Sequence, residues 1–384
     1  MALYLSFKEV WRNKGRFFLF SLVIALITTL VLFIAALADG LALANKEYLE
    51  KLDAELLVFQ ENTDYSTTVS RIGRSKINDV ARIPGVAEVG GIGFSNGTLA
   101  LGAGLEDLDV SLIGVEALKP GAPPVLAGEP LLTDRGSEAI IDATVAKRAG
   151  AEVGDWIQIK TTQGTEEQTY ELRVSGITDN RQYFFQPSIF LPYRTWDQIR
   201  PQGAMTGPGN EFAVNILAVK TENPEDWQRV AALIDSGVKG LETSDIKTAY
   251  ESQPGYAAQQ NTLNTQRIFV LLIGILVIGG FFQIQMLQKV PQIGVLKAVG
   301  ASNLTVATTV VSQIILVTTF GVFFGALVSF GLAAGIPDVV PVVFNGESVL
   351  IAIVSLLLIG PIGGLVSVRL AVRVEPLIAL GLSS

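Results

Sequence analysis

The side chains that could carry out chemistry in this chain are few. It has no cysteine and no histidine, which excludes disulfides, thiolate nucleophiles, Ser-His-Asp triads and the usual zinc sites. The clusters of acids, Glu106 with Asp107 and Asp109, and Glu166 with Glu167, lie in turn-like stretches and are typical of solvated loops. The sequence holds no Gly-x-x-x-x-Gly-Lys-[Ser/Thr] phosphate loop. We therefore expect no catalytic residue, no metal site, no cofactor and no ATP hydrolysis by that route.

One stretch has a composition that suits binding to another protein. Residues 288–303 read Gln-Lys-Val-Pro-Gln-Ile-Gly-Val-Leu-Lys-Ala-Val-Gly-Ala-Ser-Asn. Pro291 is expected to open a short helical turn, Gly300 to close it and Ser302 to cap the next helix. A short amphipathic helix of this kind fits the groove of another protein; the alternative is a tight hairpin with an interfacial helix. The residues predicted to dock are Gln292, Ile293, Gly294, Val295, Leu296, Lys297, Val299 and Gly300.

Four apolar runs flank and position this stretch. Hydrophobic residues make up 49% of the chain and charged residues 17%, against about 25% charged residues in soluble domains. Each run reaches the roughly 20 residues that a bilayer requires. The first run could instead be a cleaved signal peptide, but it is longer than the roughly 7–15 apolar residues of such segments. The predicted spans are 17–38, 268–287, 304–336 and 349–368.

The basic residues beside the four runs indicate one orientation. All of them fall on one side of the membrane if the N-terminus is cytoplasmic, and four crossings return the C-terminus to the cytoplasm. The segment 288–303 and the tail 369–384 are then cytoplasmic, while 39–267 and the loop 337–348 are external. The external segment is acidic, which argues against nucleic-acid binding. The flanking bases are Lys8, Arg12, Lys14, Arg16, Lys289, Lys297, Arg369 and Arg373.

Residues 1–16 mix apolar side chains with bases. Trp11, Arg12, Lys14 and Arg16 are the residues that would hold such a segment on the cytoplasmic leaflet, with Trp11 at the depth of the lipid headgroups. We expect an amphipathic helix that lies on the bilayer. A basic flank that only sets the topology would have the same composition.

Residues 39–267 are predicted to form an α+β domain on a helical stalk. The first apolar run is expected to continue outward through 39–52, and 243–267 is helix-permissive except at Pro254-Gly255, which should break it. Between them, alternating apolar residues and turn signals predict short strands and helices. They suggest a β-rich piece around 100–195 and an α/β piece from 55–90 with 210–245. The predicted strands are 54–60, 110–115, 139–142, 156–162, 170–174, 189–191 and 212–219, and the predicted helices are 77–82, 143–149 and 225–234.

The chain resembles the FtsX-like and MacB-like permease family of ABC transporters. Residues 292–302 are similar to the family signature Glu-Ile-Gly-x-Leu-Lys-Ala-x-Gly-Ala-Ser, and 6–16 looks like its amphipathic entry helix. Residues 138–176 look like its periplasmic core domain, and 371–380 resemble its Ala-x-Arg-x-x-Pro-x-x-Ala-Leu close. The likeness covers nearly the whole chain and fits the four-span (type VII) members, with some similarity to the DevC branch.

The resemblance implies partners and a mechanism. Family members form dimers in the bacterial inner membrane, bind a separate ABC ATPase on the cytoplasmic side and some work with a periplasmic adaptor. ATP-driven closure is coupled to movement of the external domain, for export or mechanotransmission. The chain departs from the signature at Lys289 and Gln292, where the family usually has Arg and Glu, and Pro291 is also unusual. Docking is therefore expected to depend on the apolar face and Lys297.

Two other functions remain open at this stage. An FtsX-type regulator of envelope hydrolases would use the same fold and the same ATPase. A ligand-sensing receptor would need a larger cytoplasmic part than this chain offers. The spans hold no charged residue, which disfavours an ion-coupled transporter.

Overall fold

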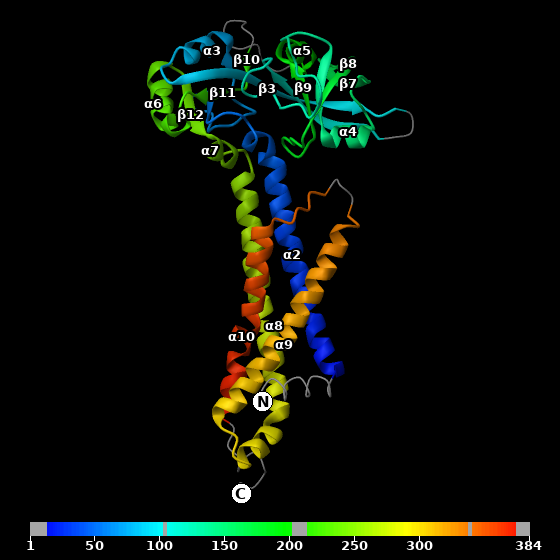
Figure 1. Cartoon of the computed structure of the whole chain (residues 1–384), viewed down its shortest axis with the longest axis vertical. Helices are drawn as coiled ribbons and strands as arrows, with labels where there is room; N and C mark the ends of the chain where they lie inside the picture. The colour runs from blue at the N-terminus through cyan, green and yellow to red at the C-terminus, as the bar shows by residue number, and fades with distance from the viewer. Residues whose placement is uncertain (1–13, 103–105, 202–212, 337–339, 374–384) are drawn as a thin grey trace. The chain divides into compact units, whose positions relative to one another are not determined.

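The computed structural model describes residues 14–102, 106–201, 213–336 and 340–373, which form two compact units (Figure 1). The membrane unit combines Met1–Leu41 with Gln259–Ser384, and the globular unit is Ala42–Ala258. Trp11 and Arg12, with residues 1–13 of the predicted surface helix, lie outside the described residues, whereas its last residues, Lys14 to Arg16, belong to the long helix that enters the membrane. Lys14 lies in the first described turn of a long helix.

Four helices are long and apolar enough to cross a membrane. Each predicted span falls on one of them, except that residues 334–336 lie beyond the end of the third helix. Two predictions about the flanks are also confirmed: the first helix continues to Glu50, and the second begins only after Pro254 and Gly255, where Gly255 has a φ of 85°. The four helices are α2 (Lys14–Glu50), α8 (Tyr256–Ala298), α9 (Asn303–Ala333) and α10 (Gly346–Arg373).

Glycines let the membrane helices approach one another closely. A Cβ atom at Gly321 would lie 2.6 Å from the Cβ of Ile24, and one at Gly325 would lie 2.5 Å from the carbonyl oxygen of Ala25. The hydroxyl of Thr29 also donates to the carbonyl of Gly325 at 3.0 Å. Close helix contacts of this kind are typical of membrane interiors. On the α9–α10 side, Cβ atoms at Gly360 and Gly364 would likewise collide with α9. Both Gly-x-x-x-Gly pairs therefore serve packing within one chain.

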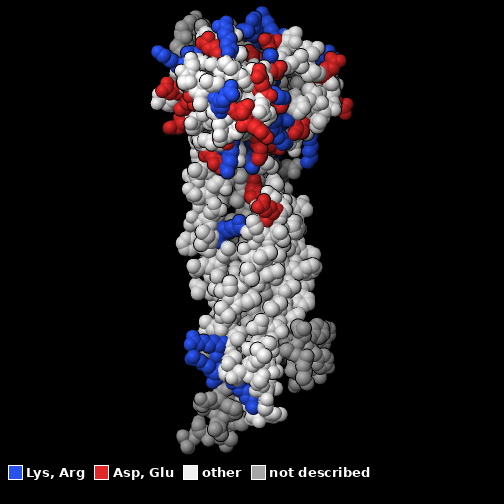
Figure 2. Space-filling model, turned by 60° about the vertical axis from the view of Figure 1, so that its left-hand side comes forward, with Lys and Arg blue, Asp and Glu red and all other residues white. Residues whose placement is uncertain are grey.

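Charge is distributed unevenly over the membrane unit. Figure 2 shows its helices almost free of charged side chains along their length, with Lys and Arg gathered toward the end where α8 and α9 connect. An apolar lateral surface with a basic end is the pattern expected of helices in a bilayer.

The globular unit is built on one ten-stranded sheet, with a separate two-stranded ladder. The sheet order is β12-β1-β11-β3-β4-β9-β6-β8-β5, and β7 pairs with both β3 and β8. The strands β3, β4, β9, β6, β8 and β7 thus form a closed hydrogen-bonded ring. The strands are β1 (Leu56–Gln60), β2 (Ile72–Gly73), β3 (Val86–Ala100), β4 (Leu108–Val115), β5 (Ala127–Gly128), β6 (Glu138–Asp142), β7 (Trp156–Gln163), β8 (Glu166–Thr178), β9 (Ser188–Pro192), β10 (Ala213–Val214), β11 (Ile216–Thr221) and β12 (Leu241–Asp245).

Short helices cover the sheet and connect its strands. The helix α4 matches its predicted bounds, begins at the cap Asp142 and ends at Gly150, which has a φ of 62°. The core of the unit holds Leu56, Leu112, Ile141 and Trp196, each at most 1% exposed. The helices are α3 (Arg74–Ala81), α4 (Ala143–Ala149), α5 (Tyr193–Ile199), η1 (Pro224–Asp226), α6 (Trp227–Gly237) and α7 (Ile246–Glu251).

The structure corrects four expectations. The strand β3, which pairs with β11 of one predicted piece and with β4 of the other, was not predicted. The helix α5 was not predicted either. Residues 241–245 form the strand β12, although 243–267 reads as helix-permissive, because pairing with β1 outweighs local propensity. Finally, α8 continues through Pro291 to Ala298 instead of giving way to a new helical turn.

Candidate functional site

The predicted docking stretch forms the end of α8 and a tight turn into α9. The apolar run ends near Leu287, so α8 extends about 16 Å further at 1.5 Å per residue before it ends at Ala298. Gly300, with a φ of 103°, donates to the carbonyl of Lys297 at 3.0 Å, and Ala301 donates to that of Leu296 at 3.1 Å. This is the Schellman pattern of a helix C-terminus.

The next helix begins immediately after this turn. The hydroxyl of Ser302 accepts a hydrogen bond from the backbone of Thr305 at 3.2 Å, so Ser302 caps α9 as predicted. With one helix end and one helix start fixed within a few residues, the turn has little conformational freedom. A rigid surface of this kind loses little entropy on binding.

The turn carries three exposed apolar side chains, which we call the docking triad. Val295 is 49% exposed, Leu296 41% and Val299 85%. They lie at spacings of one, three and four residues at the end of α8, which places them on neighbouring parts of the helix surface. Exposed apolar side chains beyond the membrane span are a feature of surfaces that bind another protein.

Other residues of the predicted stretch have internal roles. Ile293 is 7% exposed and belongs to the core of the membrane unit, and Gly294 is buried beside it. The ammonium group of Lys297 donates to the carbonyl of Val372 at 2.6 Å, near the end of α10. Gln292 is exposed. The structure therefore brings together the docking triad and separates it from Ile293 and Lys297.

Lys289 ties three membrane helices together. Its ammonium group donates to the side-chain oxygen of Gln313 on α9 at 2.9 Å and lies 5.6 Å from the ring centre of Phe17 on α2. Gln313 is buried and Lys289 half-buried, and a polar pair that is satisfied in this way helps to fix the packing of helices in an apolar surrounding. The Lys at position 289 thus holds the base of the docking turn in place.

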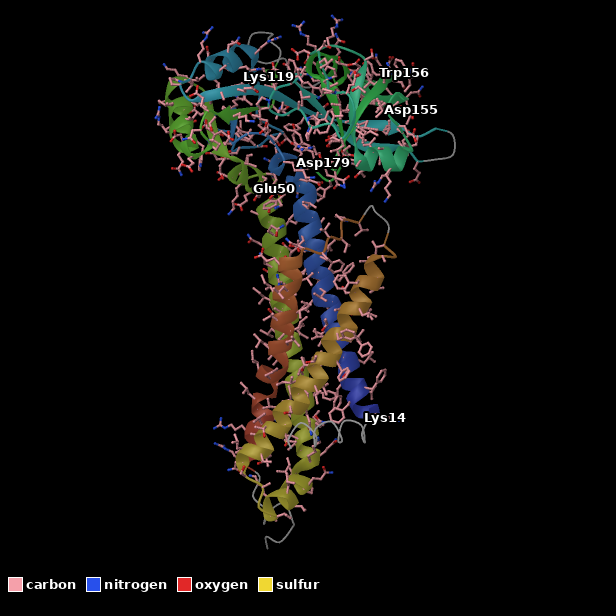
Figure 3. All side chains as sticks on the ribbon, in the orientation of Figure 1. Lys14, Glu50, Lys119, Asp155, Trp156 and Asp179 are labelled. Atoms are coloured by element: carbon pink, nitrogen blue, oxygen red, sulfur yellow. The ribbon has the colours of Figure 1, made fainter. Side chains whose placement is uncertain are left out.

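A second group of residues, the helix-base network, lies inside the globular unit at the end of α2. The ammonium group of Lys51 contacts Glu47 at 2.9 Å and Asp179 at 3.0 Å, and Asp179 accepts a hydrogen bond from Arg181 at 2.8 Å. Arg181 also donates to the carbonyl of Lys51 at 2.8 Å. Figure 3 shows Glu50 and Asp179 beside this end of the helix. We define the network as Glu47, Lys51, Asp179 and Arg181.

Backbone hydrogen bonds join the same two segments. The backbone of Tyr48 donates to the carbonyl of Gln182 at 3.1 Å, and the backbone of Phe185 donates to that of Ala44 at 3.2 Å. The last turns of α2 are thus fixed to the loop between β8 and β9. Sequence reasoning missed this network because its charged partners are far apart in the chain.

The environment of the network shifts its ionisation. Burial alone would lower the pKa of Lys51, but hydrogen bonds with Glu47 and Asp179 outweigh burial and raise that pKa. Burial would raise the pKa of Asp179, but hydrogen bonds from Arg181 and Lys51 outweigh it and lower the pKa. Both shifts favour the charged forms, so the pairs persist across neutral pH.

Asp142 fixes the same loop from the other side. Its carboxylate caps α4 by accepting from Val145 at 2.7 Å and also accepts from the backbone of Ser188 at 2.7 Å. Ser188 in turn donates to the carbonyl of Arg181 at 2.6 Å. Burial raises the pKa of Asp142 to about 6. Through these hydrogen bonds Asp142 joins the start of α4 to the start of β9.

Comparison with known proteins supports the resemblance found in the sequence. The model of the MacB-like periplasmic core domain matches residues 17–236, and that of the FtsX-like permease C-terminal domain matches residues 267–376. A Staphylococcus haemolyticus protein named "Putative hemin transport system permease protein HrtB" is 27% identical over 98% of this chain and 99% of its own length. An "Uncharacterized ABC transporter permease" of Mycobacterium bovis is 20% identical over 99% of both chains.

Solved structures with some likeness cover about half of the chain. The extracellular domain of the ABC-type transporter YknZ from Gram-positive bacteria covers 50% of this chain and 99% of its own, with 14% identity and a TM-score of 0.35. The periplasmic region of MacB from Actinobacillus actinomycetemcomitans covers 54% and 95%, with 15% identity and a TM-score of 0.37.

Proposed function

Since the chain belongs to the family of ABC transporter permeases with a MacB-like periplasmic core domain and an FtsX-like permease domain, we propose that it couples ATP hydrolysis by a separate ATPase to movement of its globular unit. The observation that carries this proposal is the docking triad at the end of α8. It is an apolar surface on a rigid turn, and it lies at the basic end of the membrane unit.

The orientation follows from the same end of the molecule. Lys14, Lys289, Lys297, Arg369 and Arg373 are described bases that flank the four helices on one side, and such residues usually stay in the cytoplasm. The docking triad then faces the cytoplasm, where ATP is available, and the globular unit lies outside. The sequence itself has no phosphate loop, so ATP binding belongs to the partner.

The mechanical path begins in the membrane and ends in the globular unit. The helix α2 is continuous from Lys14 to Glu50, and the helix-base network holds its last turns to the loop before β9. A shift of α2 along or about its axis would therefore be transmitted to the ring of six strands. This mechanism serves export and mechanotransmission alike and requires no charged path through the bilayer. A dimer of this chain with two ATPase subunits, alone or with a periplasmic adaptor, is the assembly we propose.

The docking triad provides the direct test. Burial of a Leu side chain contributes about 1.5–3 kcal/mol, so Leu296→Asp is expected to weaken ATPase binding by at least roughly ten-fold. The measurement is co-purification of the permease with ABC ATPases co-expressed from the same genome. Leu132→Asp is the matched control, since Leu132 is 61% exposed in the globular unit, and it should leave ATPase binding unchanged. Full ATPase binding by the Leu296→Asp protein would show that the turn is only a hairpin.

A labelling arm separates failure of docking from failure of orientation. The chain is free of cysteine, so Val299→Cys introduces a single thiol at a site that is 85% exposed. A membrane-impermeant maleimide should label it in inside-out vesicles and leave it unlabelled in right-side-out vesicles. The opposite pattern would overturn the proposed orientation whatever the docking result.

A further inference from the structure

An apolar groove runs along the surface of the membrane unit between α2 and α9. Its volume is about 610 Å³, within the range of roughly 300–1,000 Å³ that small-molecule pockets have. One wall comes from Leu316, Phe320, Phe324 and Val328, which repeat every four residues along α9, and Phe18 contributes to the other wall. Lys14 lies at one end of the groove (Figure 3).

The groove is a consequence of how the two helices cross. At Gly321 and Gly325 the backbones approach so closely that a Cβ atom would collide with α2. The neighbouring positions Phe320 and Phe324 carry large side chains that are 47% and 50% exposed. Small residues at the crossing and large residues beside it leave a channel along one face of the pair.

Each wall of the groove is about as long as one leaflet of a bilayer is thick. Lys14 to Ala25 on α2 spans about 16 Å, and Leu316 to Val328 on α9 spans about 18 Å, at 1.5 Å per residue. Half of the hydrocarbon core of a bilayer is about 15 Å. The two walls are offset, since Ser21 contacts Val317 and Ala25 lies against Gly325. A single acyl chain that enters beside Lys14 would therefore lie along the α2 wall and reach Phe320 and Phe324 on α9.

The polar groups of the groove are distributed asymmetrically. Ser21 donates to the carbonyl of Val317 at 3.4 Å, so its hydroxyl is already bonded within the protein. Among the lining residues, Lys14 is the one with a charge, and it stands at the end where α2 begins. An ammonium group at headgroup level attracts an anionic lipid.

We infer that this groove binds one acyl chain of an anionic phospholipid, with its phosphate near Lys14. This site is independent of the ATPase dock and of the direction of transport. The lipid fills the gap beside the α2–α9 crossing and so holds the angle between these two helices. A second copy of the chain seated in the groove is the competing occupant that the experiment must detect.

The test uses fluorescence quenching by lipids with brominated acyl chains. Phe324→Trp places a reporter in the groove, and Phe323→Trp places one at the adjacent, 60% exposed position as the matched control. The full chain is reconstituted in vesicles with brominated phosphatidylglycerol or brominated phosphatidylcholine, and the signal of the unmodified protein is subtracted. We expect the Phe324→Trp protein to prefer phosphatidylglycerol by about five-fold, the effect of one basic residue at a membrane surface, and the control to show no preference.

Lys14→Gln should remove this preference while quenching itself remains. Equal quenching of the Phe324→Trp protein by both lipids would overturn the inference, and so would a preference that survives Lys14→Gln. If Phe324→Trp does not insert, Leu22→Trp on the opposite wall replaces it. Cross-linking between copies of a Phe320→Cys protein, together with absence of quenching, would show that a second copy occupies the groove and would also overturn the inference.

Discussion

The docking triad and the helix-base network each lie at the end of a long helix, yet their chemistry is opposite. Val295, Leu296 and Val299 are apolar, exposed and without a covering element among the described residues. Arg181 and Glu47 are charged and less than a tenth exposed, and their partners come from the same chain. The first set is suited to contacts that form and break with another protein, whereas the second fixes a permanent connection within one unit.

This difference predicts which property each site controls. Changes in the helix-base network should alter the stability of the globular unit and leave ATPase binding intact. Changes in the docking triad should have the reverse effect. Three substitutions can break or sharpen this contrast, and they follow in order of expected size.

Arg181→Met should give the largest effect. It keeps most of the side-chain volume but leaves Asp179 and the carbonyl of Lys51 without their hydrogen bonds from Arg181, and loss of such charge-assisted bonds costs about 2–3 kcal/mol. Heat unfolding of the full chain, followed by the fluorescence of Trp156, Trp196 and Trp227 in the globular unit, should show a midpoint lower by about 5–10 °C.

A surface ion pair is the control for this change. Lys220 contacts Asp53 at 2.6 Å, but Asp53 is 76% exposed, so Lys220→Met should shift the midpoint far less. An equal shift for both variants would mean that the helix-base network contributes no more than an exposed pair does.

Asp142→Asn should alter the pH dependence of stability. The pKa of Asp142 is raised to about 6 in the folded chain, so the folded state binds its proton more tightly than the unfolded state does. The stability that this proton contributes is then fully present below the unfolded pKa and is lost as the pH rises through 6, by about 1–2 kcal/mol between pH 5 and pH 8. The chain has no histidine to add a slope in this range. Denaturant unfolding at both pH values should show a smaller decline in the Asp142→Asn protein, and an unchanged decline would assign it to other groups.

Lys297→Met is expected to have the smallest effect. The side chain of Lys297 is engaged with the carbonyl of Val372 at the end of α10, and a cation at a helix C-terminus contributes about 0.3–1 kcal/mol. Stability of the membrane unit should fall by that amount, and ATPase co-purification should change less than two-fold. A strong loss of ATPase binding would place Lys297 in the dock, as its position in the sequence first suggested.

Much of the membrane unit could be predicted because local sequence determines it. A run of about 20 apolar residues usually forms a membrane-spanning helix. The cap at Ser302 and the turn at Gly300 depend on local backbone chemistry. The apolar face of this stretch was predicted as one set that included Ile293 together with the docking triad. The inward direction of Ile293 was not, since burial depends on helices far away in the chain.

The strands of the globular unit were harder to predict where glycines interrupt the alternation of apolar and polar residues. The strand β3 reads Val-Ala-Glu-Val-Gly-Gly-Ile-Gly-Phe-Ser-Asn-Gly-Thr-Leu-Ala. A Cβ atom at Gly93 or at Gly114 on β4 would collide with the ring of Trp196, whose indole donates to the carbonyl of Leu112 at 3.1 Å. Glycine is thus needed at these two positions to leave room for Trp196 on α5, a helix that was not predicted from the sequence either. The helix-base network was not predicted either, because its charged partners are far apart in the sequence.

The pairing of β1 with β12 has a consequence for biosynthesis. These strands are the first of the globular unit and its last, and Leu56 lies opposite Asp245. During synthesis, the backbone groups at that edge of β1 must wait until nearly all of the globular unit has emerged from the ribosome. Closure of such a long loop is slow. The unpaired β1 strand is therefore an aggregation-prone edge in the nascent chain until β12 pairs with it.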